Sequence, residues 1–292
     1  MSGTKTCVLE KSENCDFIHG LLERRLARDE IDLPLLPEVA IRVTRLARGD
    51  SASAGQLSDI INADPALTMY VLRIAASAAK RPASPIVSLH HAVAWLGFDE
   101  VANIAFTLAL QGKMLNIPGQ NQRARRLWRH ALATALWARH LASMLARDAG
   151  MSYLCGLLHT IGKPVTLGAV HELAQRTQVK LTGEEYDRLL ETFYRHIGAQ
   201  VLAAWGLPSV VIGTVTQWEA YADAGDLRPD CNIVNVAHRL ANYTLTDSIR
   251  LSRELLVVEP AYQDLGFAAV DAVALFDAAG SINADLDTYL PP

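Results

Sequence analysis

Histidine is the residue type in this chain whose spacing best suggests chemistry. Four of the nine histidines lie on separate predicted helices or helix ends of the C-terminal part, and these are His130, His159, His196 and His238. Imidazole nitrogens bind zinc, iron, nickel and copper, and helical bundles build metal centres from inward-facing side chains on separate helices. The four histidines are therefore candidate metal ligands. The alternative for each one is a packed, hydrogen-bonded histidine of the core.

The residue after His159 is Thr160, within the segment from Tyr153 to Lys163. A histidine followed by an aspartate in such a setting would supply two adjacent metal ligands to a helical phosphohydrolase, whereas a threonine hydroxyl is neutral. Two dications held close together repel each other strongly unless carboxylates bridge them. The sequence therefore predicts no two-metal centre, no catalysis and no cofactor. It predicts a vestigial pocket, whose residues are His130, His159, Thr160, His196 and His238.

One transition-metal ion held by imidazoles alone is the alternative to an empty pocket. Glu219 and Asp223 are acidic candidates nearby, but their spacing does not place them inward. Cys155 and His159 stand four residues apart, as a nucleophile and its base would on a helix, yet no third group orients them, and packing explains the pair better. The chain has no nucleophile elbow, no phosphate-binding glycine loop and no dinucleotide fingerprint.

Composition excludes several classes of protein. The chain has 292 residues, half of them apolar, and its 27 basic and 31 acidic residues give a net charge of −4. It therefore lacks the basic surface of a general nucleic-acid binder. A local basic group is interpreted as the solvated start of a helix, and its members are Arg123, Arg125, Arg126 and Arg129. No apolar stretch approaches the about 18 residues that span a bilayer, and no signal peptide is recognisable. We expect a cytoplasmic protein without membrane contact.

The elements that must position the histidines are predicted to be helices throughout, because strand alternation is scarce and helix-start signals are frequent. Asp64-Pro65 combines an N-cap with a proline in the first turn. A capping box starts at Thr182. Ser88 and Asp99 are predicted to cap two further helices.

A break at Pro118-Gly119, inside the polar segment 116–122, predicts a junction between two subdomains. We expect a tail and first helix over 1–32, an N-terminal helical subdomain over 33–118, and a second helical subdomain with a C-terminal extension over 119–292. The second subdomain should open with a long helix from Arg123 to Asp148. A last helix should run from Leu265 to Ala279.

Five motifs, in order along the chain, resemble the HDOD family, the HD-related output domains of bacterial signalling proteins. They are Leu33–Val39, Asn62–Ala78, Ser88–Gly97, Gly156–Lys163 and His196–Pro208. The resemblance covers the chain from about Leu33 to Asn242. It implies an all-α fold, in which an N-terminal helical bundle packs on an HD-like helical bundle. It also implies a regulatory module that works by binding.

Residue by residue, the resemblance implies that His130 is the first ancestral metal histidine. His159 and Thr160 would be the His–Asp pair, from which the aspartate has been lost. His196 matches an accessory histidine of the family.

The chain departs from the hydrolase pattern at further positions. His238 stands where the ancestral fold uses a final aspartate. Gln217 and Trp218 occupy the place where a pair of histidines is common. These departures add to the loss at Thr160, and together they argue against hydrolysis.

The leading hypothesis is thus a non-catalytic bacterial signal-transduction output protein that acts through contacts with other signalling proteins, with a homodimer left open. One rival is a residual metal-dependent phosphohydrolase or phosphodiesterase that uses the four histidines. Another is a regulator that binds a nucleotide second messenger, with Arg73, Lys80 and Arg81 as phosphate contacts. DNA binding is the weakest alternative, given the acidic balance of the chain.

Overall fold

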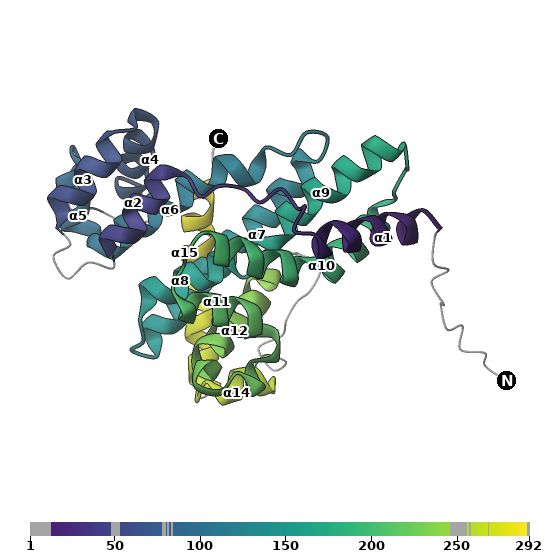
Figure 1. Cartoon of the computed structure of the whole chain (residues 1–292). Helices are drawn as coiled ribbons and strands as arrows, with labels where there is room; N and C mark the ends of the chain where they lie inside the picture. Colours follow the sequence, from purple (N-terminus) through teal and green to yellow (C-terminus); the bar gives the residue numbers. More distant parts are fainter. Residues whose placement is uncertain are drawn as a thin grey trace.

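Every regular element in the described part of the chain is a helix, so the all-α prediction is confirmed. The computed structural model describes residues 13–47, 53–77, 80, 82, 84–245, 256, 258–267 and 269–290. The α-helices are α1 (Glu13–Ala27), α2 (Glu38–Ala47), α3 (Ala54–Asn62), α4 (Pro65–Ala75), α5 (Leu89–Leu96), α6 (Phe98–Leu115), α7 (Asn121–Met144), α8 (Ala149–Leu158), α9 (Gly162–Thr177), α10 (Gly183–Ala204), α11 (Ser209–Gln217), α12 (Arg228–Leu245), α14 (Pro260–Asp264) and α15 (Ala269–Tyr289) (Figure 1). Two short 3-10 segments, η1 (Trp218–Asp223) and η2 (Gly225–Leu227), separate α11 from α12.

Side-chain caps set several of these helix starts, as the sequence predicted. The Asp64 carboxylate accepts hydrogen bonds from the first free backbone N–H groups of α4, and Ser88 caps α5. Thr182 and Glu185 form the predicted capping box of α10, because each side chain bonds to the backbone of the other. The prediction for Asp99 was wrong. Gly97 takes the N-cap position of α6 with a φ of 86°, which leaves Asp99 in the first helical turn.

Two predicted helix ends were also wrong. The long helix α7 stops at Met144, not at Asp148, and Ala146 follows in the left-handed region with a φ of 51°. Asp148 instead starts the next helix, since its carboxylate accepts from the Met151 N–H at 2.8 Å. The last helix, α15, starts at Ala269 and continues to Tyr289, ten residues beyond the predicted end at Ala279.

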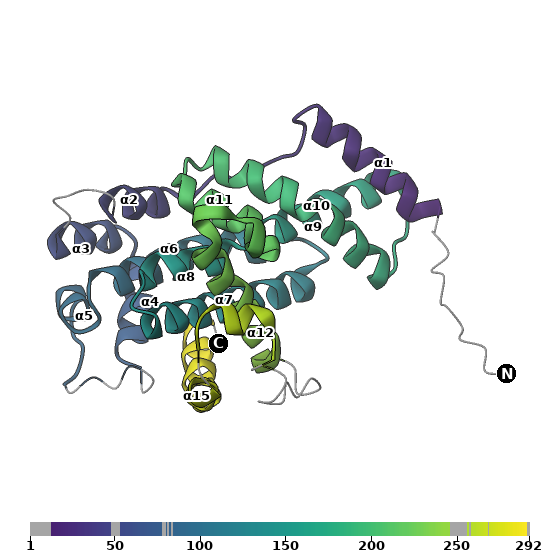
Figure 2. The same ribbon diagram turned by 90° about the horizontal axis from the view of Figure 1, so that it is seen from below.

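The helices form two packed groups. Helices α2 to α5 gather at one end of the molecule against α6, while α1 lies at the opposite end against α9 and α10 (Figures 1 and 2). Helix α7 is the centre of the C-terminal group, because it packs against α8, α9, α12 and α15, and it also contacts α6. Its Trp137 is fully buried, and the indole N–H donates to the Thr244 hydroxyl at 2.8 Å.

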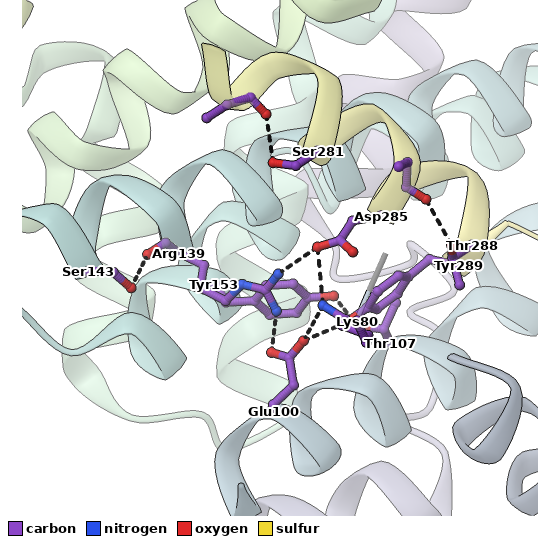
Figure 3. Close-up of polar contacts among 12 residues, drawn as sticks. Lys80, Glu100, Thr107, Arg139, Ser143, Tyr153, Ser281, Asp285, Thr288 and Tyr289 are labelled. Atoms are coloured by element: carbon purple, nitrogen blue, oxygen red, sulfur yellow. Dashed lines mark hydrogen bonds and ion pairs between the residues drawn. The ribbon is translucent and has the colours of Figure 1, made fainter. Parts of the chain in front are cut away.

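The C-terminal helix α15 ties the two groups together through a charge cluster, which consists of Lys80, Glu100, Arg139 and Asp285 (Figure 3). Lys80 follows α4, while the other three residues come from α6, α7 and α15. The Lys80 ammonium lies 2.9 Å from Glu100 and 3.1 Å from Asp285, and the Arg139 guanidinium pairs with the same two carboxylates. The side chains are 11–18% exposed, so these ion pairs are largely shielded from water.

Within the described residues, no single helix has the length and apolar character needed to cross a membrane. Helices α5 and α6 would reach the required length only as a pair, and the chain bends by 119° between them.

Candidate functional site

Three of the four candidate histidines meet inside the C-terminal group of helices. His130 belongs to α7, His159 is the C-cap residue of α8, and His238 belongs to α12. These three residues are called the histidine cluster. Gly156 allows the approach, because a Cβ at that position would lie 2.8 Å from the Ala135 Cα of α7. The small residue therefore brings α8, and with it His159, against α7.

The imidazoles of the histidine cluster are in direct contact. The potential ligand nitrogens of the three rings all lie within 4.8 Å of one another. The His159 Nδ1–H donates to the Gly156 carbonyl oxygen at 2.7 Å, which leaves Nε2 as an acceptor. That nitrogen lies 3.0 Å from Nδ1 of His238, which must donate in a cluster of neutral rings. His130 completes the group, with its ring centroid 4.6 Å from that of His238.

Burial keeps the histidine cluster neutral near pH 7. Burial and the Lys163 ammonium lower the pKa of His130 to about 4, although a hydrogen bond with Asn242 opposes the shift. Burial, His130 and Lys163 lower the pKa of His238 to about 3. The pKa of His159 is lowered well below its ordinary value, first by burial and then by the two neighbouring histidines. Neutral imidazole is the form that binds metal ions.

A pocket of about 390 Å³ opens beside the histidine cluster, and it is lined by Arg123, Arg126, Leu127, His130, Thr160, Lys163, Asp187, His238 and Asn242. Thr160 is thus part of the pocket, as predicted, and offers a hydroxyl there. Arg123 pairs with Asp187, and the Lys163 ammonium lies 2.6 Å from the Glu191 carboxylate. Arg126 and Lys163 give one wall of the pocket a basic character.

Trp218 forms another side of the site, and the sequence noted it only as a departure from the family pattern. The indole is buried, and its centroid lies 5.2 Å from that of His159 and 4.7 Å from that of His238. The Asn235 side chain of α12 donates to the Trp218 carbonyl at 3.2 Å and fixes the start of η1. The sequence shows that residue 218 is a tryptophan. The turn from α11 into η1 decides that its side chain lies against the histidine cluster.

The structure does not bring His196 into the histidine cluster, so the prediction that it lines the pocket was wrong. His196 is exposed on α10, because packing against α9 and α11 uses other faces of that helix. Glu219 is also exposed, and its carboxylate is bonded to Tyr194 and Arg195. Asp223 is exposed as well, as its spacing suggested.

The site lacks a usable protein nucleophile at Cys155. Its thiol is buried, and burial raises its pKa to about 12, so the reactive thiolate is scarce near pH 7. Packing explains the spacing of Cys155 and His159. What remains for chemistry is a set of three neutral imidazole nitrogens beside a partly basic pocket.

The model of the HDOD domain matches residues 33–221 of this chain. An uncharacterized protein of Treponema pallidum (strain Nichols) is 26% identical over 192 residues, which are 63% of this chain. The match spans only 37% of the length of that relative.

Solved structures share the fold. A crystal structure of an HDOD domain protein with unknown function from Geobacter sulfurreducens has a TM-score of 0.72 and 22% identity, over 93% of this chain and 100% of its own. A candidate metal-dependent phosphohydrolase from Shewanella amazonensis SB2B has a TM-score of 0.71 and 22% identity, over 96% of this chain and 100% of its own. A candidate signal transduction protein from Marinobacter aquaeolei VT8 has a TM-score of 0.67 and 25% identity, over 95% of this chain and 66% of its own.

Proposed function

This chain belongs to the HDOD domain family, and from that premise we propose that it is a non-catalytic, regulatory output protein of signal transduction. It acts through contacts with other proteins, in the cytoplasm, and does not hydrolyse phosphate esters. The Marinobacter neighbour carries the same kind of description, as a signal transduction protein.

The observation that carries this proposal is the chemistry of the histidine cluster. Among the described residues, the group that converges there offers three imidazoles and no carboxylate. A phosphohydrolase of the two-metal type needs anionic ligands to hold two dications a few ångströms apart. Thr160 lines the pocket with a neutral hydroxyl, which cannot serve as an anionic ligand. The nearby carboxylates of Asp187 and Glu191 are already paired, with Arg123 and Lys163 respectively.

Exposed apolar side chains support the protein-contact part of the proposal. Four large ones lie on or beside the N-terminal helices: Leu35 (84% exposed), Met69 (68%), Val87 (79%) and Trp95 (42%). Methionine and aromatic side chains, such as those of Met69 and Trp95, are enriched at protein interfaces. We therefore propose that the N-terminal group of helices carries the partner contacts.

Hydrolysis of bis(p-nitrophenyl) phosphate and of a panel of cyclic nucleotides tests the lack of catalysis. The assay uses the full chain with added Mn²⁺, Co²⁺ or Zn²⁺. We expect the wild-type chain and the His159→Ala variant to show the same background rate. Metal-dependent turnover that disappears in His159→Ala would overturn the non-catalytic proposal.

Cross-linked capture from the native cytoplasm, with mass spectrometry, tests the contacts. We expect a reproducible partner with the wild-type chain and with His159→Ala, because binding does not depend on the pocket. We expect the partner to be lost in a Leu35→Ser, Met69→Ser double variant that keeps its helical circular dichroism. Reproducible absence of any partner would count against the proposal.

A residual metal-dependent phosphohydrolase is the second candidate function. The observation in its favour is that the histidine cluster opens to a pocket with basic groups, and the Shewanella neighbour is described as such an enzyme. The hydrolysis assay above separates the two candidates directly.

Binding of a nucleotide second messenger has less support. Arg73 donates to the Thr288 carbonyl at 3.1 Å, and Lys80 belongs to the charge cluster under α15. Both cations therefore have partners within the chain, while Arg81 lies outside the described residues.

A further inference from the structure

Helix α6 leaves part of one face uncovered in the N-terminal group of helices. Helices α2 and α4 both pack against α6, and the three together line a groove of about 430 Å³ (Figure 1). The floor of this α6 groove is formed by Leu108, Gln111, Gly112 and Leu115, which share one face because they are three, four or seven residues apart on the helix. Leu108 and Leu115 are only half-buried, so the groove keeps apolar surface in contact with water.

Gln111 supplies an independent observation at the floor of the α6 groove. The side chain is only 7% exposed, and its amide Nε2 atom is buried without a hydrogen-bond partner. Buried polar atoms are nearly always paired, and each exception calls for a reason. Because Gln111 lines the groove, a bound molecule can supply the missing acceptor after a small rotation of the amide.

The rim of the α6 groove is acidic. Glu38 lies in the first turn of α2, and Asp64 is the N-cap residue of α4. None of the described residues that line the groove is a lysine or an arginine. Since binding partners carry complementary charges, the rim favours a ligand with a cationic group beside its apolar part.

The apolar surface continues beyond the α6 groove onto Met69 of α4, which is 68% exposed. Met69 follows Ala66 by three residues, and Ala66 lines the groove, so the two residues share one face of the helix. A small molecule confined to the groove would leave Met69 in water, whereas a segment of a protein can cover both. An extended segment also has unpaired backbone N–H and C=O groups, which match the donor and the acceptor of the Gln111 amide.

We propose that the α6 groove binds an extended segment of a partner protein, in which a large apolar side chain lies next to a lysine or an arginine. The apolar side chain covers Leu108 and Leu115, the backbone of the segment pairs with Gln111, and the cation lies at the acidic rim. The inference rests on the proposed function, because it names the surface and the kind of partner segment for the contacts proposed there.

Selection from a phage-displayed library of random peptides on the full chain is the first experiment. We expect the enriched peptides to combine a large apolar residue with a neighbouring lysine or arginine. One enriched peptide, synthesised with a fluorescent label, then gives a Kd by fluorescence anisotropy. Added salt should raise this Kd, because ions screen attraction between charges at an exposed rim.

Filling the α6 groove tests the place of binding. A Cβ at Gly112 meets nothing within 4 Å, so the side chain of Gly112→Leu enters the groove without disturbing the helix. We expect this variant to raise the Kd of the peptide by at least about tenfold. Gly280→Leu is the matched control, since Gly280 is an exposed glycine of α15 whose Cβ also meets nothing within 4 Å, and it should bind like the wild type.

Two further variants test the amide and the rim. Gln111→Met keeps the size of the side chain but removes the amide, and it should raise the Kd by about threefold to tenfold. The thermal unfolding temperature of the free chain should not fall in Gln111→Met, because the variant removes an unpaired buried group, whereas a merely structural glutamine would lower it. Glu38→Gln should raise the Kd by about twofold to fivefold and reduce its dependence on salt.

The outcomes separate this inference from the proposed function. No enriched peptide, enriched peptides without a basic residue, or wild-type binding by folded Gly112→Leu would overturn the inference. Gln111→Met and Glu38→Gln decide the matter if Gly112→Leu fails to fold, which circular dichroism reports. A partner that is captured from the cytoplasm equally well by Gly112→Leu would overturn the inference and leave the proposed function standing, whereas the absence of any partner counts against the proposed function itself.

Discussion

At the scale of single residues, burial and hydrogen bonding together decide the protonation state of the histidine cluster. Burial disfavours the charged form of an imidazole. His238 and His130 lower the pKa of His159 further, and His130 lowers that of His238, because two protonated neighbours repel. The Gly156 carbonyl and the contact with His238 satisfy both nitrogens of the neutral His159 ring, whereas the buried Nε2 of His130 has no hydrogen-bond partner. The cluster is therefore stable only while its histidines are neutral.

Acidification should destabilise the folded chain through these residues. The pKa of His130 is about 4 in the folded chain, against 6.5 as its ordinary value. The unfolded chain therefore binds more protons between these values, and the free energy of unfolding falls as the pH falls from 7 to 5. The expected loss from His130 alone is about 2 kcal/mol, measured by urea unfolding across this range.

The matched variants are His130→Gln, which replaces the imidazole by a polar amide that cannot titrate, and His196→Gln at an exposed position. We expect the first to flatten the pH dependence and the second to leave it as in the wild type. An unchanged slope in His130→Gln would show that this histidine does not carry the effect.

At the scale of elements, glycines set how closely the helices of the C-terminal group approach. Gly162, the first residue of α9, lies directly against α10, where a Cβ would stand 1.8 Å from the Tyr194 carbonyl oxygen and 2.7 Å from the Gly198 nitrogen. Gly156 plays the same role between α8 and α7. Since Gly156 and Gly162 flank His159, the site depends on these two contacts.

Gly162→Ala should destabilise the chain by about 3 kcal/mol or more, because the added methyl group meets backbone atoms that cannot rotate away. Gly168→Ala is the control on the same helix, since a Cβ there meets nothing within 4 Å. We expect that control to raise stability by about 0.5–1 kcal/mol, through the loss of glycine flexibility in a helix. Denaturant unfolding of both variants measures the two changes in the free energy of unfolding. Equal changes in the two variants would refute the close contact at Gly162.

At the scale of the whole molecule, the charge cluster under α15 connects the two groups of helices (Figure 3). Burial raises the pKa of Glu100, but Arg139 and Lys80 outweigh burial and hold that pKa at about 2. Tyr289 of α15 also donates to Glu100 at 3.2 Å. Two cations and two anions thus neutralise one another where α15 meets α6 and α7.

Asp285→Asn should cost about 3 kcal/mol, because it leaves an uncompensated positive charge in a largely buried site. Asp287→Asn on the same helix removes an exposed partner of Arg129 at 3.6 Å and should change stability by less than about 0.5 kcal/mol. Hydrogen exchange adds a local measurement, in which α15 and the start of α6 lose protection in Asp285→Asn first. Equal stability of the two variants would show that the charge cluster does not hold α15 in place.

The sequence by itself determined the helical class, several helix starts and most of the histidine cluster. Caps such as Asp64 and Thr182 act through backbone groups two or three residues away, so local chemistry is sufficient to predict them. That position 160 carries a threonine and no carboxylate was also readable, because it is a matter of residue type.

Tertiary structure decided which side chains face one another. His196 lies on α10 away from the cluster, because other faces of that helix pack against its neighbours. Trp218 lies against the cluster, because the turn into η1 directs its side chain there. Lys80 and Asp285 meet although 205 residues separate them. Helical periodicity places residues on the face of one helix, but contacts between distant helices depend on how the whole core packs.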